Sequence, residues 1–278
     1  MRINVAKSAG FCFGVKRALE IAFKTARSNR QVYMLGDIVH NEDVVRKIEK
    51  SGIKKINALK KTKSDILLIR AHGASQDTLM KAAKLGYHII DATCPMVKEI
   101  HKIVKEMHQE GYKIIVIGDK NHDEVQGIVG QLKNRVLVID SINSIPLVKI
   151  RKIKRACVVA QSTQNSKNVL KIVDILKSYI PDLKFFNTIC RPTRTKQEEI
   201  SSMPLKNDAM IIIGSKNSAN TKRLYEISRL LNKKSWWVNS GKEIKPAWFK
   251  GARSVGITAG ASTPEGTIKD IVKYIRSV

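Results

Sequence analysis

The chain has 278 residues, of which 43% are hydrophobic and 27% charged, so it holds enough apolar side chains for one large core or several smaller ones. No segment approaches the ~18 consecutive apolar residues of a membrane span, and Gly10, Gly14 and Lys16 interrupt the apolar stretch near the N-terminus, which therefore lacks the core of a signal peptide. We expect a cytoplasmic protein with no membrane association, whose 4 cysteines are thiols or metal ligands rather than disulfides.

The charge is strongly basic. Lysine and arginine number 51 against 24 acidic residues, a net charge of +27. Such a field attracts acidic partners, which include nucleic acid, an anionic membrane, phosphorylated small molecules and acidic proteins. Because the lysines are spread along the chain and aromatic residues are only 5%, we interpret the basic runs as solvated faces rather than as a nucleic-acid site.

Apolar strands and polar turns repeat along the chain. The first strand of each repeat ends in a Gly-Asp or Gly-Ser turn, at 32–36, 114–118 and 210–214. The second ends in alanine and a polar cluster, at 66–71, 157–160 and 255–259. A third strand ends in cysteine, at 88–94 and 184–190. The N-terminal segment 3–12 supplies the strand that ends in cysteine for the last repeat. Helical spacing of apolar residues predicts helices at 15–26, 97–107, 169–176 and 224–231.

This repeat predicts an α/β protein made of three similar α/β domains with small, mainly parallel sheets. The expected boundaries are 13–96, 97–192, and 193–278 together with 1–12. Parallel α/β sheets place their functional loops beyond the carboxyl ends of the strands. If the three domains face one another, the polar clusters at these strand ends converge on a shared centre.

The cysteines differ in their positions along the strands. Cys94 follows the apolar pair Ile89 and Ile90 and precedes Pro95, so it should lie between a strand end and a helix start, where the helix favours the thiolate. Cys157 lies inside a strand and should be a packed core thiol.

The strand-end clusters hold a distinctive set of side chains. The thiols are Cys12, Cys94 and Cys190, the imidazoles are His40, His72 and His122, the single carboxylate is Glu124, and the hydroxyls and amides are Thr163, Gln164, Ser218, Asn220 and Ser262. Three thiolates can hold zinc with a fourth ligand, or an iron–sulfur cluster with one iron lacking a protein ligand, and the spacing leaves both open. Histidines beside neutral hydrogen-bond donors suit a multiply charged anion such as a diphosphate.

Several runs, in this order, resemble the LytB family of 4-hydroxy-3-methylbut-2-enyl diphosphate reductases over essentially the whole chain: GFCFGVKRAL, VHNEDVV, RAHGAS, DATCPMV, GDKNHDEVQG, AQSTQ, NTIC, GSKNSANTKRL and TAGASTP. The resemblance implies a trefoil of α/β domains around a [4Fe–4S] cluster. It also implies the last step of the non-mevalonate isoprenoid route, in which an allylic hydroxyl is lost as water and isopentenyl and dimethylallyl diphosphates are formed.

The resemblance also implies a role for each residue. Cys12, Cys94 and Cys190 hold the cluster, and Glu124 delivers protons. The diphosphate is bound by His40, His72, His122, Ser218, Asn220 and Ser262, and Thr163 lies near the departing oxygen. The iron without a protein ligand binds the substrate hydroxyl as a Lewis acid. The expected electron donor is an acidic ferredoxin or flavodoxin, drawn by the basic surface.

Two positions depart from the family pattern. Ala219 stands where a serine is usual, which removes one hydroxyl from the phosphate site. Lys196 replaces an arginine and loses a bidentate contact if one is made, whereas Thr193 keeps a hydroxyl beside the cluster.

Other function classes are compatible with parts of the pattern. A basic iron–sulfur or zinc protein that binds nucleic acid as a redox sensor would use the charge, although it would not need Glu124 or the histidines. A zinc hydrolase would use an open metal position with Glu124 as the base.

Overall fold

The computed structural model describes residues 1–133 and 135–277. The chain forms two compact units. The first comprises Met1–Lys16, Val39–Arg46 and Arg191–Val278, and the second comprises Arg17–Ile38 and Lys47–Cys190. The expected α/β class with small parallel sheets is confirmed, because every strand pairing within the described residues is parallel. The predicted domain boundaries stay a prediction.

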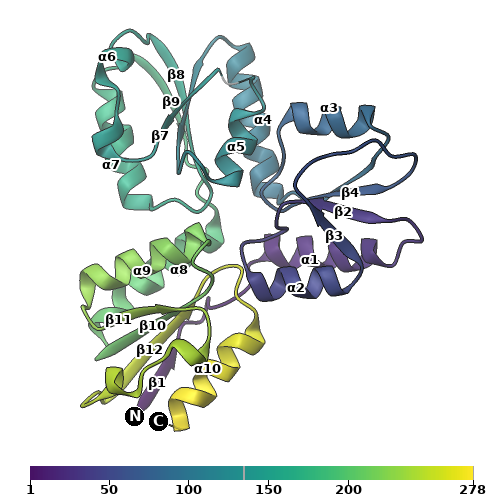
Figure 1. Ribbon diagram of the computed structural model, residues 1–278. Coiled ribbons are helices and arrows are strands. Elements are labelled where there is room, and N and C mark those ends of the chain that lie inside the picture. The colour runs from purple at the N-terminus through teal and green to yellow at the C-terminus, as the bar shows by residue number, and fades with distance from the viewer. Residues whose placement is uncertain (134, 278) are drawn as a thin grey trace. The chain divides into compact units, whose positions relative to one another are not determined.

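The first unit contains one 4-stranded sheet in the order β1-β12-β10-β11. Its strands are β1 (Arg2–Val5), β10 (Ala209–Ile213), β11 (Ser235–Val238) and β12 (Ser254–Ala259). Alternate residues of β10 face opposite sides, where Ile211 and Ile213 pack with α10 (Glu265–Ser277), and Met210 and Ile212 with α8 (Arg191–Ser202) and α9 (Ala219–Leu231). Both faces are therefore covered by helices (Figure 1).

The second unit contains two 4-stranded sheets, in the orders β3-β2-β4-β5 and β7-β6-β8-β9. The strands of one are β2 (Val32–Leu35), β3 (Ile53–Ile56), β4 (Ile66–Ile69) and β5 (His88–Asp91). Those of the other are β6 (Lys113–Ile117), β7 (Val136–Ile139), β8 (Arg155–Ala160) and β9 (Asp182–Phe186). Because both faces of β6 and β8 are covered, these strands are continuous apolar runs rather than alternating ones.

The remaining helices connect these strands. The α-helices are α1 (Phe13–Ala26), α2 (Glu42–Lys50), α3 (Gln76–Lys84), α4 (Pro95–Gln109), α5 (Asp123–Val129), α6 (Leu147–Ile150) and α7 (Ser166–Lys177). Short 3₁₀ turns lie at Ile142–Ser144, Met203–Leu205, Gly241–Glu243 and Pro246–Phe249. The helices predicted at 15–26, 97–107, 169–176 and 224–231 are confirmed as parts of α1, α4, α7 and α9.

The three sheets share one strand order, and this confirms the repeat. In each, two inner strands lie between two edge strands, and β1 completes the C-terminal sheet by pairing with β12 in the register Arg2 to Ser254. The N-terminal segment thus closes the last repeat as predicted. Each sheet also has an edge strand that the sequence analysis missed, namely β3, β7 and β11.

Cys157 lies in the core, as predicted. It is fully buried on the face of β8 that packs against α4 and α5, among Ile114, Val116 and Val159. Burial raises the pKa of its thiol to about 12. Within the described part of the chain, no helix combines the length and the apolar character needed to cross a bilayer.

Candidate functional site

Every predicted site residue lies between the carboxyl end of a parallel strand and the first turn of the helix that follows. Backbone N–H groups at a helix start have no partner within the helix, and the helix dipole makes that end positive. Strand-end loops of this kind are where parallel α/β proteins bind anions and reactive groups. The positions that the sequence selected therefore share one structural context in both units.

The three cysteines proposed as ligands each stand directly before a helix. Cys12 precedes α1, Cys94 is the N-cap of α4 with Pro95 in the first turn, and Cys190 precedes α8. Each backbone N–H donates to a carbonyl of a neighbouring strand-end loop: Cys12 to Ala261 (3.1 Å), Cys94 to Ala71 (3.0 Å) and Cys190 to Ser162 (3.0 Å). All three residues are half-buried, unlike Cys157. Metal ions are bound by thiolates, so half-buried cysteines at strand ends are suitable ligands.

Glu124 carries a buried carboxyl group in the second unit. Its side chain is 2% exposed, and its carboxylate accepts hydrogen bonds from the backbone N–H of Ser162 (2.5 Å) and from the Ser162 hydroxyl (2.8 Å). Burial raises the pKa of Glu124, and the two hydrogen bonds from Ser162 oppose this effect without cancelling it. The site thus favours a proton on this carboxyl group.

His72 and His122 contact each other, and His122 also contacts the backbone of Glu124. Their rings meet edge to face with centroids 5.4 Å apart. His122 caps helix α5, and its Nδ1 accepts a hydrogen bond from the backbone N–H of Glu124 (3.1 Å). In the neutral ring an accepting Nδ1 places the proton on Nε2, so His122 presents an N–H donor to an anionic ligand.

Thr163 is held by a glutamine that the sequence analysis did not single out. Gln161 is fully buried, and its Nε2 donates to the Thr163 hydroxyl (3.0 Å) while its Oε1 accepts from the backbone N–H of Asp119 (2.9 Å). Gln161 and Ser162 both belong to the run AQSTQ. Their position in that run was the sequence signal that could have identified both residues. The hydrogen bonds of Ser162 with Glu124 could not be predicted, because they join residues far apart in the chain.

The first unit brings His40 together with Ser262, Ser218 and Asn220 at the strand ends of its sheet. The hydroxyl of Ser262 donates to the His40 carbonyl (2.9 Å). Ser218 caps helix α9 through its hydroxyl, and the Asn220 side-chain oxygen accepts from the backbone N–H of Ala261 (3.0 Å). The loops that follow β10 and β12 are thereby tied to one another and to the segment that carries His40.

Glu42 is a further residue that the sequence analysis missed. Its carboxylate accepts hydrogen bonds from the Ser215 hydroxyl (2.7 Å) and from the amides of Asn217 (3.3 Å) and Asn239 (3.4 Å). These donors follow β10 and β11, and Glu42 lies two residues beyond His40. The contacts fix the position of the His40 segment within the first unit.

Lys196 is a buried residue that contacts the main chain. It is 2% exposed, and its ammonium group donates to the carbonyls of Ser8, Gly10 (3.0 Å) and Ala259 (3.2 Å). These contacts hold the turn before Cys12.

Ala219 is the buried first residue of α9, and Thr193 is buried in α8.

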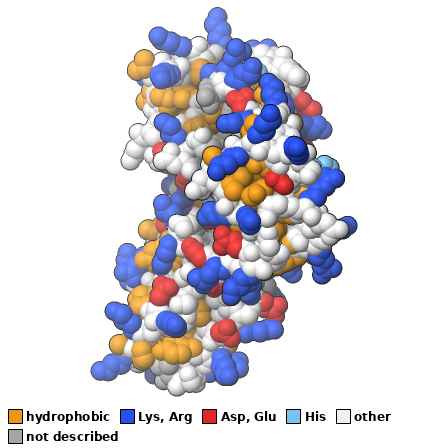
Figure 2. All heavy atoms as spheres, turned by 45° about the vertical axis from the view of Figure 1, so that its right-hand side comes forward, with side chains coloured by type: hydrophobic (Ala, Val, Ile, Leu, Met, Phe, Trp, Pro, Cys, Tyr) orange, Lys and Arg blue, Asp and Glu red, His pale blue; other side chains and the backbone are white. Residues whose placement is uncertain are grey.

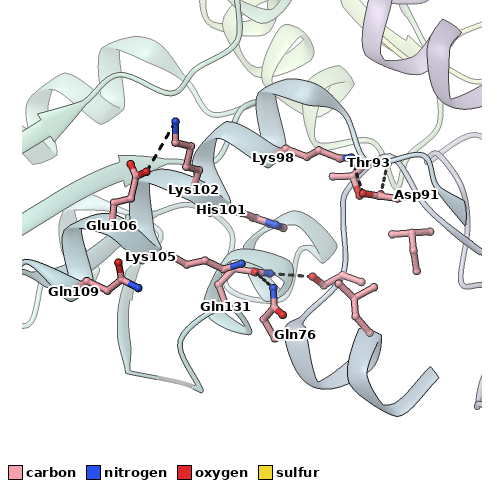
Figure 3. A pocket seen from close by; sticks show the side chains of 13 residues that line it. Gln76, Asp91, Thr93, Lys98, His101, Lys102, Lys105, Glu106, Gln109 and Gln131 are labelled. Carbon is pink, nitrogen blue, oxygen red and sulfur yellow. Dashed lines mark hydrogen bonds and ion pairs between the residues drawn. The ribbon is translucent and has the colours of Figure 1, made fainter. Parts of the chain in front are cut away.

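A pocket of about 480 Å³ lies beside helix α4, and His101 projects between α4 and the end of α5 (Figure 3). Lys98, Lys102 and Lys105 line it from the same helix. Burial lowers the pKa of His101 to about 4, and Lys105 adds to the effect. An added Cβ at Gly73 would lie 2.9 Å from the ring, so His101 packs against the loop that carries His72.

Comparisons with known proteins are consistent along the whole chain. A model of the LytB protein family matches residues 3–276. The chain is 41% identical to the 4-hydroxy-3-methylbut-2-enyl diphosphate reductase of Geotalea daltonii, with 100% of this chain and 98% of that protein covered. It is also 41% identical to the reductase of Campylobacter hominis, with both chains covered in full.

Solved structures of two such reductases are similar to this chain. One, described as the terminal enzyme of the non-mevalonate pathway, is 37% identical with a TM-score of 0.71 and 100% coverage of both chains. The other is the reductase of Plasmodium falciparum, which is 30% identical with a TM-score of 0.91, with 98% of this chain and 87% of that chain covered.

Proposed function

The chain belongs to the LytB family, and from this membership we propose the reaction and the residues that carry it. The protein is a 4-hydroxy-3-methylbut-2-enyl diphosphate reductase. It removes the allylic hydroxyl of this substrate reductively, as water, and gives isopentenyl and dimethylallyl diphosphates in the terminal step of the non-mevalonate pathway. Two electrons and two protons are consumed in each turnover.

We propose that Cys12, Cys94 and Cys190 hold a [4Fe–4S] cluster. Half-buried thiols at strand ends are suited to it, because such clusters are held by cysteine ligands, whereas Cys157 is excluded by its position in the core. The bound cluster would supply electrons and an iron for the substrate hydroxyl. Convergence of the three cysteines, in a trefoil of the three predicted domains, is part of this proposal.

The diphosphate is bound by neutral donors and histidines in both units. His72 and His122 act from the second unit. His122 offers its Nε2–H, because its Nδ1 accepts a hydrogen bond from the backbone N–H of Glu124. His40, Ser218, Asn220 and Ser262 act from the first unit, where helix α9 begins at Ser218. Backbone N–H groups at that helix start compensate for the missing hydroxyl at Ala219.

Glu124 supplies the proton for the leaving oxygen, with Thr163 beside it. Burial raises the pKa of this carboxyl group, which favours its protonated form and so suits a general acid. Ser162 fixes the orientation of the carboxyl group from a neighbouring strand end. Thr163, oriented by Gln161, contributes a hydroxyl that can relay a proton.

The electron donor is an acidic carrier protein such as a ferredoxin or flavodoxin. Lysine and arginine side chains are spread over the face shown in Figure 2, with fewer acidic ones among them. This basic surface favours encounter with an acidic protein over encounter with a basic one. We place the reaction in the cytoplasm.

The observation that carries this proposal is the shared placement of the site residues at strand ends, in a chain matched by the family along its length. The test is anaerobic purification with iron and sulfide analysis, followed by turnover of the allylic diphosphate with a chemical reductant. Close to four irons and four sulfides per chain and formation of both products are expected. Zinc without sulfide would instead support a hydrolase, and an intact cluster without turnover would support a sensor.

A further inference from the structure

An ion pair joins the loop that carries His72 to the helix that carries His122 and Glu124. The Arg70 guanidinium lies 2.6 Å from the Asp123 carboxylate, with side chains 23% and 30% exposed. Arg70 directly follows β4 and lies two residues before His72, and Asp123 lies between His122 and Glu124. The pair therefore spans the gap between two strand ends at the level of the two histidines.

The surroundings of Arg70 hold its guanidinium in one place. Gly36 has φ +76°, and a Cβ added there would lie 2.7 Å from Nη1 of Arg70. One nitrogen of the guanidinium thus lies close to Gly36, in space that a side chain would fill, and this packing limits the freedom of Arg70. An ion pair whose partners are partly buried and already ordered loses less entropy than one at an open surface.

Other contacts join the loop after β4 to the C-terminal end of α5. The Gln131 amide donates to the Ala74 carbonyl (3.0 Å), and the backbone N–H of Gln76 donates to the Gly130 carbonyl (3.2 Å). These contacts lie at the C-terminal end of α5. The Arg70 and Asp123 pair lies at its N-terminal end, where Asp123 directly follows His122.

We propose that Arg70 and Asp123 are positioning residues that set His72 against His122 for binding of the diphosphate. This inference rests on the proposed function. Neither side chain is assigned a contact with substrate. Their role is to fix the edge-to-face arrangement of the imidazoles, so that both rings meet the same anion.

The expected consequence is a loss of binding rather than a loss of chemistry. Glu124 is held by Ser162 independently of Arg70, so proton delivery should survive when the pair is broken. Removing an interaction that serves substrate and transition state alike raises KM and leaves kcat unchanged. A small misalignment of binding groups is enough for about a 10-fold rise in KM.

The test is a double-mutant cycle with R70Q, D123N and the double variant, each carrying its cluster. We measure KM and kcat with a chemical reductant, the melting temperature, and the affinity for inorganic diphosphate by calorimetry. Both single variants should raise KM about 10-fold and weaken diphosphate binding similarly, with kcat within about 3-fold. The double variant should be no worse than either single variant, because one interaction is lost in all three.

A matched pair supplies the control. Arg155 and Asp182 form an arginine–aspartate pair (2.8 Å) at the start of β8 and β9, at the other end of the strands in the same unit. R155Q and D182N should change the melting temperature to a similar extent and leave KM unaltered. The proposal is overturned if R70Q and D123N leave KM and diphosphate binding unchanged, if their effects on KM add, or if the control variants raise KM equally. Absence of turnover in the unaltered chain would instead count against the reductase function.

Discussion

Glu124 and Ser162 are joined by a pair of hydrogen bonds that connect two strand ends, with the backbone N–H of Ser162 on one carboxylate oxygen and its hydroxyl on the other. The same serine accepts the backbone N–H of Cys190 through its carbonyl. One residue thus positions the proposed proton donor and a proposed cluster ligand. The proposed proton donor is thus connected to one proposed ligand, Cys190, within the second unit.

Replacement of Glu124 by glutamine should slow turnover by about 100-fold or more while leaving the cluster and substrate binding intact. A glutamine can keep both contacts, because its oxygen accepts from the Ser162 N–H and its amide can donate to the Ser162 hydroxyl. It cannot deliver a proton. Turnover, iron content and diphosphate affinity are compared with the unaltered protein. Near-normal turnover would show that the proton comes from another group.

Ser162→Ala should act in a milder and different way. It removes the hydroxyl contact that lowers the pKa of Glu124 and keeps the backbone contact. Loss of that contact raises the pKa further, so the protonated acid persists to higher pH. The alkaline limb of the plot of kcat against pH should therefore move to higher pH. At neutral pH, kcat should fall by less than about 10-fold. An unmoved limb would contradict the assignment of that limb to Glu124.

Cys157→Ala should leave the iron content of the protein unchanged. The thiol is fully buried in β8, its pKa is raised to about 12, and no thiolate forms there near neutral pH. Cys94→Ser is the comparison, because Cys94 directly precedes helix α4 and should be a ligand. Iron analysis after anaerobic reconstitution distinguishes the two. A loss of iron in Cys157→Ala as large as that in Cys94→Ser would exclude the ligand set proposed here.

Sequence periodicity was sufficient to predict the repeat, the parallel sheets and the placement of the site residues at strand ends, because buried parallel strands are long apolar runs. It missed β3, which reads Ile-Lys-Lys-Ile and is apolar only at its ends, and α8, whose sequence is mostly polar. The contacts of Glu42 with Ser215 and of Ser162 with Glu124 join distant segments. No local pattern encodes such contacts, so only the folded chain brings them to light.

The rate with an acidic protein donor should fall steeply as ionic strength rises. The net charge of +27 steers an acidic carrier toward the protein, and salt screens this attraction beyond a Debye length of about 8–10 Å. Turnover with a small neutral reductant serves as the control, since it needs no steering. As the salt concentration rises, the rate with the protein donor should fall, whereas the rate with the small reductant should stay nearly constant. Equal salt responses would count against a basic docking surface.

His101 should make the protein less stable below neutral pH. Its pKa is about 4 in the folded chain and 6.5 when unperturbed, because burial and Lys105 disfavour the imidazolium and Asp91 only partly opposes them. Between these values the unfolded chain binds a proton that the folded chain does not, so stability is lost as pH falls from about 6.5 to about 4.

Replacing His101 by leucine tests this contribution. The substitution removes the titrating ring and fills a similar volume beside Gly73. The unaltered protein should lose up to about 3 kcal/mol more than the His101→Leu variant over this range. Urea unfolding of both proteins at pH 7.5, 5.5 and 4.5, monitored by circular dichroism, measures the difference. Because Lys98, Lys102 and Lys105 line the same pocket in both proteins, their effects cancel in the comparison. Parallel stability curves for the two proteins would show that His101 is protonated freely in the folded chain.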